Sequence, residues 1–173
     1  GLKVLNEEDA KSFIDEAVKD NSEESIDFLV QAIQSTIREN SAFSLYALKR
    51  LFDIPVDCSE KLCSIINFRM MSEFRKKIME TCFDNLNEGK ATKATCKILS
   101  KLAQTFYITE NPFPEDFVCK MVNMVRDKKI ESTDALPVIV SYLSNIKESI
   151  SPEIIHMLIE LGPCDELWEF LHD

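Results

Sequence analysis

The sequence predicts an all-α protein of about nine or ten antiparallel helices stacked as helical hairpins. Apolar residues recur with the helical period of about 3.6 residues, and no segment shows the alternation that is typical of a half-buried strand. Glycine occurs only three times in 173 residues. Because β-hairpins and phosphate-binding loops need glycine for their backbone conformations, its scarcity favours short polar connections between helices.

The first two predicted helices have the clearest apolar stripes. The first starts near Asn6, where three carboxylates (residues 7–9) meet the positive end of the helix dipole. Its predicted buried residues are Ala10, Phe13, Ile14, Ala17 and Val18. A second helix follows the break at residues 20–22. Its predicted buried residues are Ile26, Leu29, Val30, Ile33 and Ile37.

The middle of the chain leaves one boundary open. Ser41 is the expected cap of a third helix that Pro55 ends. A fourth helix is predicted from about Ser59, and a fifth is predicted to be capped by Ser72, although a single helix over 59–87 fits the pattern as well. The predicted buried residues of the fourth are Leu62, Cys63, Ile65, Ile66 and Phe68.

Proline and serine mark the starts of the later helices. Pro114 suits the first turn of a seventh helix, after a sixth that ends before the segment NPFPED. Residues 132–133 open an eighth helix, in which Pro137 falls early enough to be tolerated. Ser151 followed by proline opens a ninth, and a short tenth is predicted around residues 165–171.

The two-helix units begin near residues 7, 42, 72, 114 and 152, a spacing of roughly 30 to 42 residues. In helix length and unit spacing the chain resembles the armadillo and HEAT family of α-solenoids over most of its length, without a consensus motif. A MIF4G-like helical domain, itself a stack of helical hairpins, fits equally well. The first resemblance implies binding of a protein or linear peptide, and the second implies a link to RNA in translation or RNA processing.

Composition favours an intracellular location, in the cytoplasm or the nucleus. None of the six cysteines forms a CxxC pair, and most lie beside apolar residues, so free buried thiols in a reducing compartment are expected. No apolar run approaches the roughly 20 residues that would cross a membrane. The length fits one domain over 1–173, and the initial Gly1 suggests a fragment of a larger protein.

Nothing in the sequence predicts catalysis, a cofactor or a metal site. The two histidines, His156 and His172, lie on a predicted helix and next to the end of the chain. Pairs of acidic residues occur at predicted helix starts, where capping and the helix dipole explain them. The protein is therefore expected not to be an enzyme.

Charge is unevenly distributed along the chain. Residues 1–60 carry a net charge of −7 and residues 102–173 carry −8, whereas residues 61–101 carry +5. Within this basic centre, four lysines spaced by three, four and four residues are predicted to line one side of the sixth helix. They are Lys90, Lys93, Lys97 and Lys101.

This lysine strip has three interpretations: a solvated helix edge paired with acidic neighbours, a docking site for an acidic peptide, or a nucleic-acid site. A pI near 4.8 makes nucleic acid the least favoured. Arg69, Arg75, Lys76 and Lys77 would extend the strip if the fifth helix packs beside the sixth.

The C-terminal segment contains the sole tryptophan, Trp168, within the sequence ELWEFL. It is predicted either to cap the last apolar face or to anchor a partner, since tryptophan is enriched in interface hot spots. Taken together, the sequence predicts a non-catalytic interaction module for a protein or peptide, with an RNA-linked module as the alternative.

Overall fold

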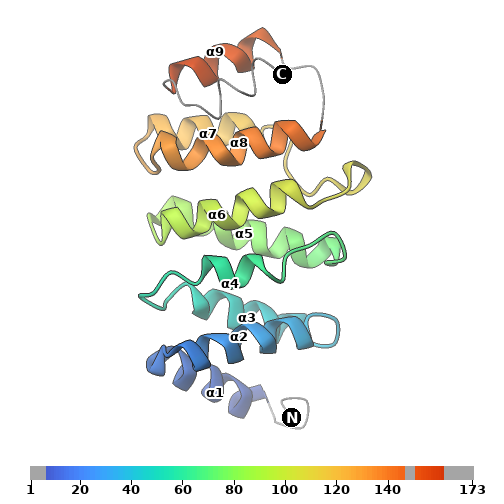
Figure 1. Cartoon of the computed structure of the whole chain (residues 1–173), viewed down its shortest axis with the longest axis vertical. Coiled ribbons are helices and arrows are strands. Elements are labelled where there is room, and N and C mark those ends of the chain that lie inside the picture. Colours follow the sequence, from blue (N-terminus) through green and yellow to red (C-terminus); the bar gives the residue numbers. More distant parts are fainter. Residues whose placement is uncertain (1–6, 147–150, 162–173) are drawn as a thin grey trace. The chain divides into compact units, whose positions relative to one another are not determined.

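The computed structural model describes residues 7–146 and 151–161, and all regular structure in these residues is helical. The all-α prediction is confirmed for this part of the chain (Figure 1). The helices fall into two compact units, Gly1–Ile65 and Ile66–Asp173, which are described separately below. The predicted tenth helix and Trp168 lie outside the described residues.

The described residues of the first unit, 7–65, form four helices. They are α1 (Glu7–Asp20), α2 (Glu23–Thr36), α3 (Ser41–Leu51) and α4 (Ser59–Cys63). Helix α2 contacts the other three, and α1 also contacts α3. The largest fully buried side chains of this unit are Ile14, Leu29, Ile33, Leu48 and Leu51. These residues recur at helical spacing, so the helices form because each can bury one apolar face against its neighbours.

Capping side chains define where two of these helices begin. The Ser22 hydroxyl accepts a hydrogen bond from the Ser25 amide at 3.2 Å at the start of α2. At the start of α3, the Asn40 side chain accepts from the Phe43 amide at 3.1 Å. The expected cap at Ser41 is therefore wrong by one residue, because the longer asparagine side chain satisfies the amide instead.

Phe13 does not lie in the core as predicted. Its side chain is 50% exposed, whereas Ile14 and Ala17 beside it on α1 are buried. The predicted apolar stripe is wider than the part of α1 that α2 and α3 cover, and Phe13 falls at its uncovered edge.

The described residues of the second unit, 66–146 and 151–161, form five α-helices and one short 3₁₀ helix. They are α5 (Ser72–Glu88), α6 (Thr92–Gln104), η2 (Ile108–Glu110), α7 (Phe117–Arg126), α8 (Ser132–Ile146) and α9 (Pro152–Glu160). Helix α6 contacts α5 and α8, while α7 contacts α8 and α9. Across both units, no helix in the described residues is both long and apolar enough to cross a membrane.

Four aromatic rings pack together in the second unit, between the segment after α6 and helices α7 and α8. Their centroids lie 4.6 to 6.2 Å apart, in tilted, edge-to-face and stacked arrangements. They belong to Phe106, Phe113, Phe117 and Tyr142. Such ring pairs stabilise a core beyond the area that they bury.

Four helix boundaries test the sequence-based expectation. α4 ends at Cys63 and α5 begins at Ser72, so the two are separate helices. The predicted cap at Ser72 is wrong by one residue, because Ser72 is the first residue of α5. The N-cap position is occupied by Met71, whose side chain makes no capping hydrogen bond. Pro114 precedes α7, and its carbonyl accepts from the Phe117 amide at 3.1 Å in a turn. The predicted cap at Ser151 is confirmed, since it accepts from the Ile154 amide at 3.3 Å.

Candidate interaction surface

The four lysines of the predicted strip do not all lie on one helix. Lys90 precedes α6, and its amide donates to the Asn85 carbonyl at 2.8 Å. Together with the left-handed Gly89, at φ +70°, this bond closes the C-terminal end of α5. The placement of Lys90 on the sixth helix was therefore wrong. α6 begins only at Thr92, after Ala91 at φ +48°, so Lys90 is not on the helix that carries the other three side chains.

Lys93 is engaged by carboxylates at the start of α8. Its Nζ lies 3.4 Å from Glu131 Oε2 and 3.5 Å from Asp134 Oδ2. The negative charge of Asp134 and the hydrogen bond from Lys93 to Glu131 raise the pKa of Lys93. This part of the strip matches the interpretation of a solvated edge paired with acidic neighbours.

The other end of the strip lies near a different set of side chains. Lys97 is exposed and Lys101 is half-buried on α6, and α5 does pack against α6 as the extension of the strip requires. The Lys101 carbonyl accepts from the Thr105 hydroxyl at 2.7 Å, and that hydroxyl also accepts from Arg75 at 3.4 Å. The first of these bonds involves the backbone of Lys101, in the last turn of α6, and that turn leads into the segment that contains Tyr107 and Ile108.

Two segments of the second unit expose large apolar side chains. Phe68 is 44% exposed and Tyr107 is 57% exposed, and their ring centroids lie 5.0 Å apart. Met71 and Ile108, on the same two segments, are 42% and 57% exposed. We call these four residues the apolar patch. Phe68 was expected to lie in the core, but α4 ends five residues before it, so no helix turns its ring inward.

The buried side chain of Arg75 connects the segment that contains Phe68 to the segment that contains Tyr107. Its side chain is only 3% exposed, and its guanidinium donates to the Asn67 carbonyl and to the Thr105 hydroxyl. No carboxylate among the described residues lies within ion-pair distance, and burial lowers the pKa of Arg75. A buried cation bonded mainly to neutral acceptors is costly, so this arginine has to be well held by its hydrogen bonds.

Further hydrogen bonds fix the backbone around the patch. The Asn67 side chain accepts from the Arg69 amide at 2.8 Å, and the Asn67 carbonyl accepts from the Met70 amide at 3.1 Å. The Ser72 hydroxyl donates to Glu110 at 3.2 Å, which joins the start of α5 to η2. The exposed rings of Phe68 and Tyr107 therefore project from backbone segments that hydrogen bonds hold in place.

Several cations that lie close to the apolar patch in the sequence have no carboxylate partner among the described residues. Arg69 and Lys76 are exposed, and within the described residues neither these side chains nor that of Lys101 has a carboxylate partner. The carboxylates of these segments are Glu73, which is exposed, and Glu110, which accepts from Ser72. With Arg75, the cations outnumber the anions here, although the whole chain carries −10.

A second basic feature is an open cavity of about 630 Å³ between the start of α6 and the turn before α8. Three lysines line it, but so do the two carboxylates that pair with Lys93. Its charge is therefore largely compensated, and it is a weaker candidate for a charged ligand than the apolar patch.

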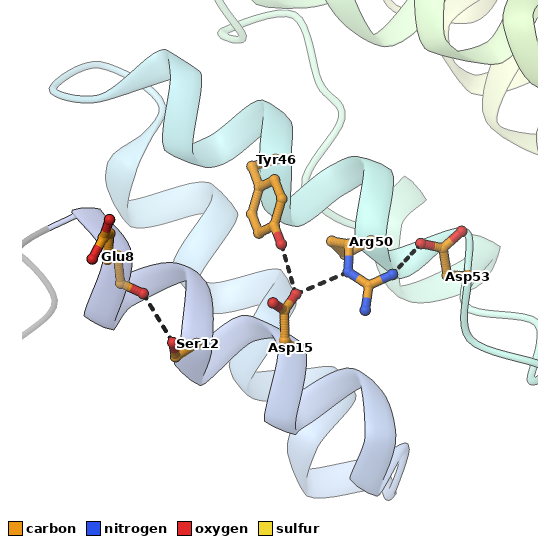
Figure 2. Close-up of polar contacts among 6 residues, drawn as sticks. All are labelled: Glu8, Ser12, Asp15, Tyr46, Arg50 and Asp53. Atoms are coloured by element: carbon orange, nitrogen blue, oxygen red, sulfur yellow. Dashed lines mark hydrogen bonds and ion pairs between the residues drawn. The ribbon is translucent and has the colours of Figure 1, made fainter.

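A polar cluster in the first unit ties α1 to α3, as Figure 2 shows. The Tyr46 hydroxyl and Arg50 Nε donate to Asp15 Oδ1 at 2.7 and 3.0 Å, and Arg50 also pairs with Asp53. The hydrogen bond from Tyr46, together with Arg50, lowers the pKa of Asp15. These bonds join α1 to α3, so a structural role accounts for the cluster.

Burial disfavours the thiolate form of two cysteines. Cys96 is buried, and burial raises the pKa of its thiol to about 12; burial also raises the pKa of Cys58. His156 is exposed on α9. In the part of the chain that the structure describes, no three or more His, Cys, Asp or Glu side chains are grouped to hold a metal ion.

Sequence reasoning missed most of the apolar patch. Tyr107 and Ile108 fall between the sixth predicted helix and the segment NPFPED, outside every helical stripe. Large apolar residues in a connection were the signal that could have indicated a surface role, because connections run over the surface. Trp168 remains a prediction, since it lies outside the described residues.

Comparison with known proteins identifies no relative. No protein-family profile, no curated protein and no solved structure matches the chain.

Proposed function

We propose that this chain is a non-catalytic interaction module that binds another protein through the apolar patch of its second unit. The observation that carries the proposal is the exposed contact between Phe68 and Tyr107, with centroids 5.0 Å apart, on a backbone held by the buried Arg75. Exposed clusters of large apolar side chains are typical of protein interaction sites, and aromatic residues contribute most of the affinity at many interfaces.

Preorganisation supports the same conclusion. Binding costs free energy when loops and side chains must be ordered at the interface. Here the two segments are already joined through Arg75 and through the hydrogen bond from Ser72 to Glu110. A partner would meet a surface that is ordered before it binds.

The helical arrangement is proposed to be that of an armadillo/HEAT-like or MIF4G-like stack of hairpins within each unit. Consecutive helices α1 and α2, α2 and α3, α5 and α6, and α7 and α8 contact one another, as hairpins of such repeats do. An experimental structure whose hairpins cannot be superposed would contradict this proposal.

Site-specific photo-crosslinking tests the function. A benzophenone amino acid at position 107 of the full chain should give protein adducts in an extract of the cells that express it. The same probe at Phe28, which is 41% exposed in the first unit, is the matched control and should give far fewer. Untagged wild-type chain should compete for the adducts, whereas chain with Tyr107→Ser should not.

Nuclease treatment separates the two functional alternatives. Adducts at position 107 that survive nuclease support a protein partner. Adducts that disappear on nuclease treatment would favour the RNA-linked alternative. Equal labelling at positions 107 and 28 would contradict the assignment of the apolar patch.

A further inference from the structure

We infer that the apolar patch binds a short peptide segment in which a large apolar side chain is flanked by acidic residues. The inference rests on the proposed function and specifies the partner's chemistry. It combines two properties of the same surface, the exposed aromatic pair and the cations that lie close to it in the sequence.

The apolar part of the surface suits the insertion of a large apolar side chain. Phe68 and Tyr107 meet at an interplanar angle of 45°, and both rings keep about half of their surface exposed. Met71 and Ile108 add flexible and branched aliphatic surface on the same two segments. A leucine or an aromatic side chain placed against them would remove apolar area from water on both partners.

The charged part favours acidic neighbours of that side chain. Arg69 follows Phe68 directly, and Lys101 lies in the last turn of α6, six residues before Tyr107. Neither Arg69 nor Lys101 has a carboxylate partner within the described residues, and the same is true of Lys76. Charges are screened over about 8 Å at physiological ionic strength, so these local cations act on a docked peptide more than the overall charge of −10 does.

The pairing of Lys93 limits the surface to one end of α6. Lys93 already contacts Glu131 and Asp134, so an acidic peptide would have to displace carboxylates there. At the other end of the helix, Lys101 has no such competitor among the described residues. The peptide is therefore expected to bind beside the end of α6 and not along its whole length.

A peptide fits this surface better than single-stranded RNA. Stacking platforms for RNA bases combine aromatic faces with a continuous basic groove. Here the two rings contact each other, two of the four patch residues are aliphatic, and the carboxylates of Glu73 and Glu110 lie on the same segments. These carboxylates interrupt the positive charge, so the segments do not form the continuous basic groove that a phosphate backbone follows.

Selection from a phage library of random 12-residue peptides tests the inference on the full chain. Wild-type chain is the bait, and the double variant Phe68→Ser with Tyr107→Ser is used for depletion. Both replaced side chains are largely exposed, so the variant should keep the circular-dichroism spectrum of wild type. Enriched peptides should combine a large apolar residue with at least two more acidic than basic residues.

The outcomes distinguish this inference from the proposed function. Patch-dependent peptides without an acidic excess would overturn the inference and leave the proposed function standing. Failure to enrich any peptide over the depleted variant would overturn the inference, while the crosslinking at position 107 would decide the proposed function separately.

Fluorescence anisotropy with one enriched peptide then measures the role of charge. Arg69→Glu with Lys76→Glu should weaken binding by about tenfold and reduce its salt dependence. Lys128→Glu with Lys129→Glu is the matched control, because it changes the net charge equally at exposed lysines that do not belong to the patch segments, and it should retain most of the affinity. Equal weakening by both pairs would overturn the local charge assignment. Tighter, patch-dependent binding of a labelled 12-nucleotide RNA would overturn the peptide assignment.

Discussion

Arg50 in the first unit and Arg75 in the second both connect helices to their surroundings, but they do so in opposite environments. Arg50 is partly exposed and pairs with Asp15 and Asp53, which raise its pKa although partial burial acts against them. Arg75 is buried and donates to a carbonyl and a hydroxyl, and burial lowers its pKa.

The difference in burial predicts that loss of Arg75 destabilises the chain more than loss of Arg50 does. Exposed ion pairs contribute roughly 0 to 1 kcal/mol because water and salt screen them. Removing a buried hydrogen-bonded group leaves its partners without water or protein to replace it, which costs more. Arg75 should therefore determine whether the apolar patch is ordered, whereas the first unit should depend mainly on its apolar core.

The largest effect is expected in that apolar core. Leu29→Ala should destabilise the chain by about 2 to 5 kcal/mol, because Leu29 is fully buried on α2 and its loss leaves a cavity. Urea unfolding followed by circular dichroism measures the change. The neighbouring variant Phe28→Ala, at a 41% exposed site, is the control and should cost much less. Similar costs for the two variants would mean that burial on α2 is assigned to the wrong face.

Arg75→Ala is expected to cost on the order of 3 kcal/mol, since it leaves a cavity and removes the hydrogen bonds from the guanidinium to the Asn67 carbonyl and the Thr105 hydroxyl. The same urea experiment measures it, with Lys76→Ala as the exposed neighbour that should change stability by no more than about 0.5 kcal/mol. Hydrogen exchange should also accelerate at the Arg69 and Met70 amides, whose acceptors lie on Asn67. Unchanged exchange there would break the link between Arg75 and the order of the patch.

The smallest effect is expected at the polar cluster of the first unit. Arg50→Ala should cost less than about 1 kcal/mol. The pKa of Asp15 should lie below its ordinary value of 3.8 and should rise when Tyr46→Phe removes the largest cause of the shift. Because the pKa is lower in the folded state, the stability that Asp15 contributes is present above pH 4 or so and is lost as the pH falls further. A ¹³C NMR titration of the carboxyl group measures it, and a midpoint at or above 3.8 would contradict the observed geometry.

Much of the helical organisation could be predicted from sequence because it depends on local patterns. Apolar spacing located α2 and its buried Leu29, and the Ser-Pro start of α9 was found from the capping preference of serine. Phe13 and Phe68 were assigned to the core for the same reason, and both are exposed. Periodicity reports which face of a helix is apolar, but it does not report how much of that face a neighbour covers.

The candidate site was predictable only in part. The basic centre and the lysine spacing were visible in the sequence, but the carboxylates that engage Lys93 lie about 40 residues away, at Glu131 and Asp134. The contact between Phe68 and Tyr107 likewise joins residues that are far apart in the chain.

The sequence by itself determined the helical class, the apolar stripes and the uneven charge, because these follow from composition and from spacing within one helix. Only the tertiary structure decided that Arg75 would be buried, that Lys93 would be paired, and that the rings of Phe68 and Tyr107 would meet at the surface. The physical reason is that burial, pKa and pairing depend on which segments, far apart in the sequence, come together in space. A local sequence pattern contains no information about which segments these are.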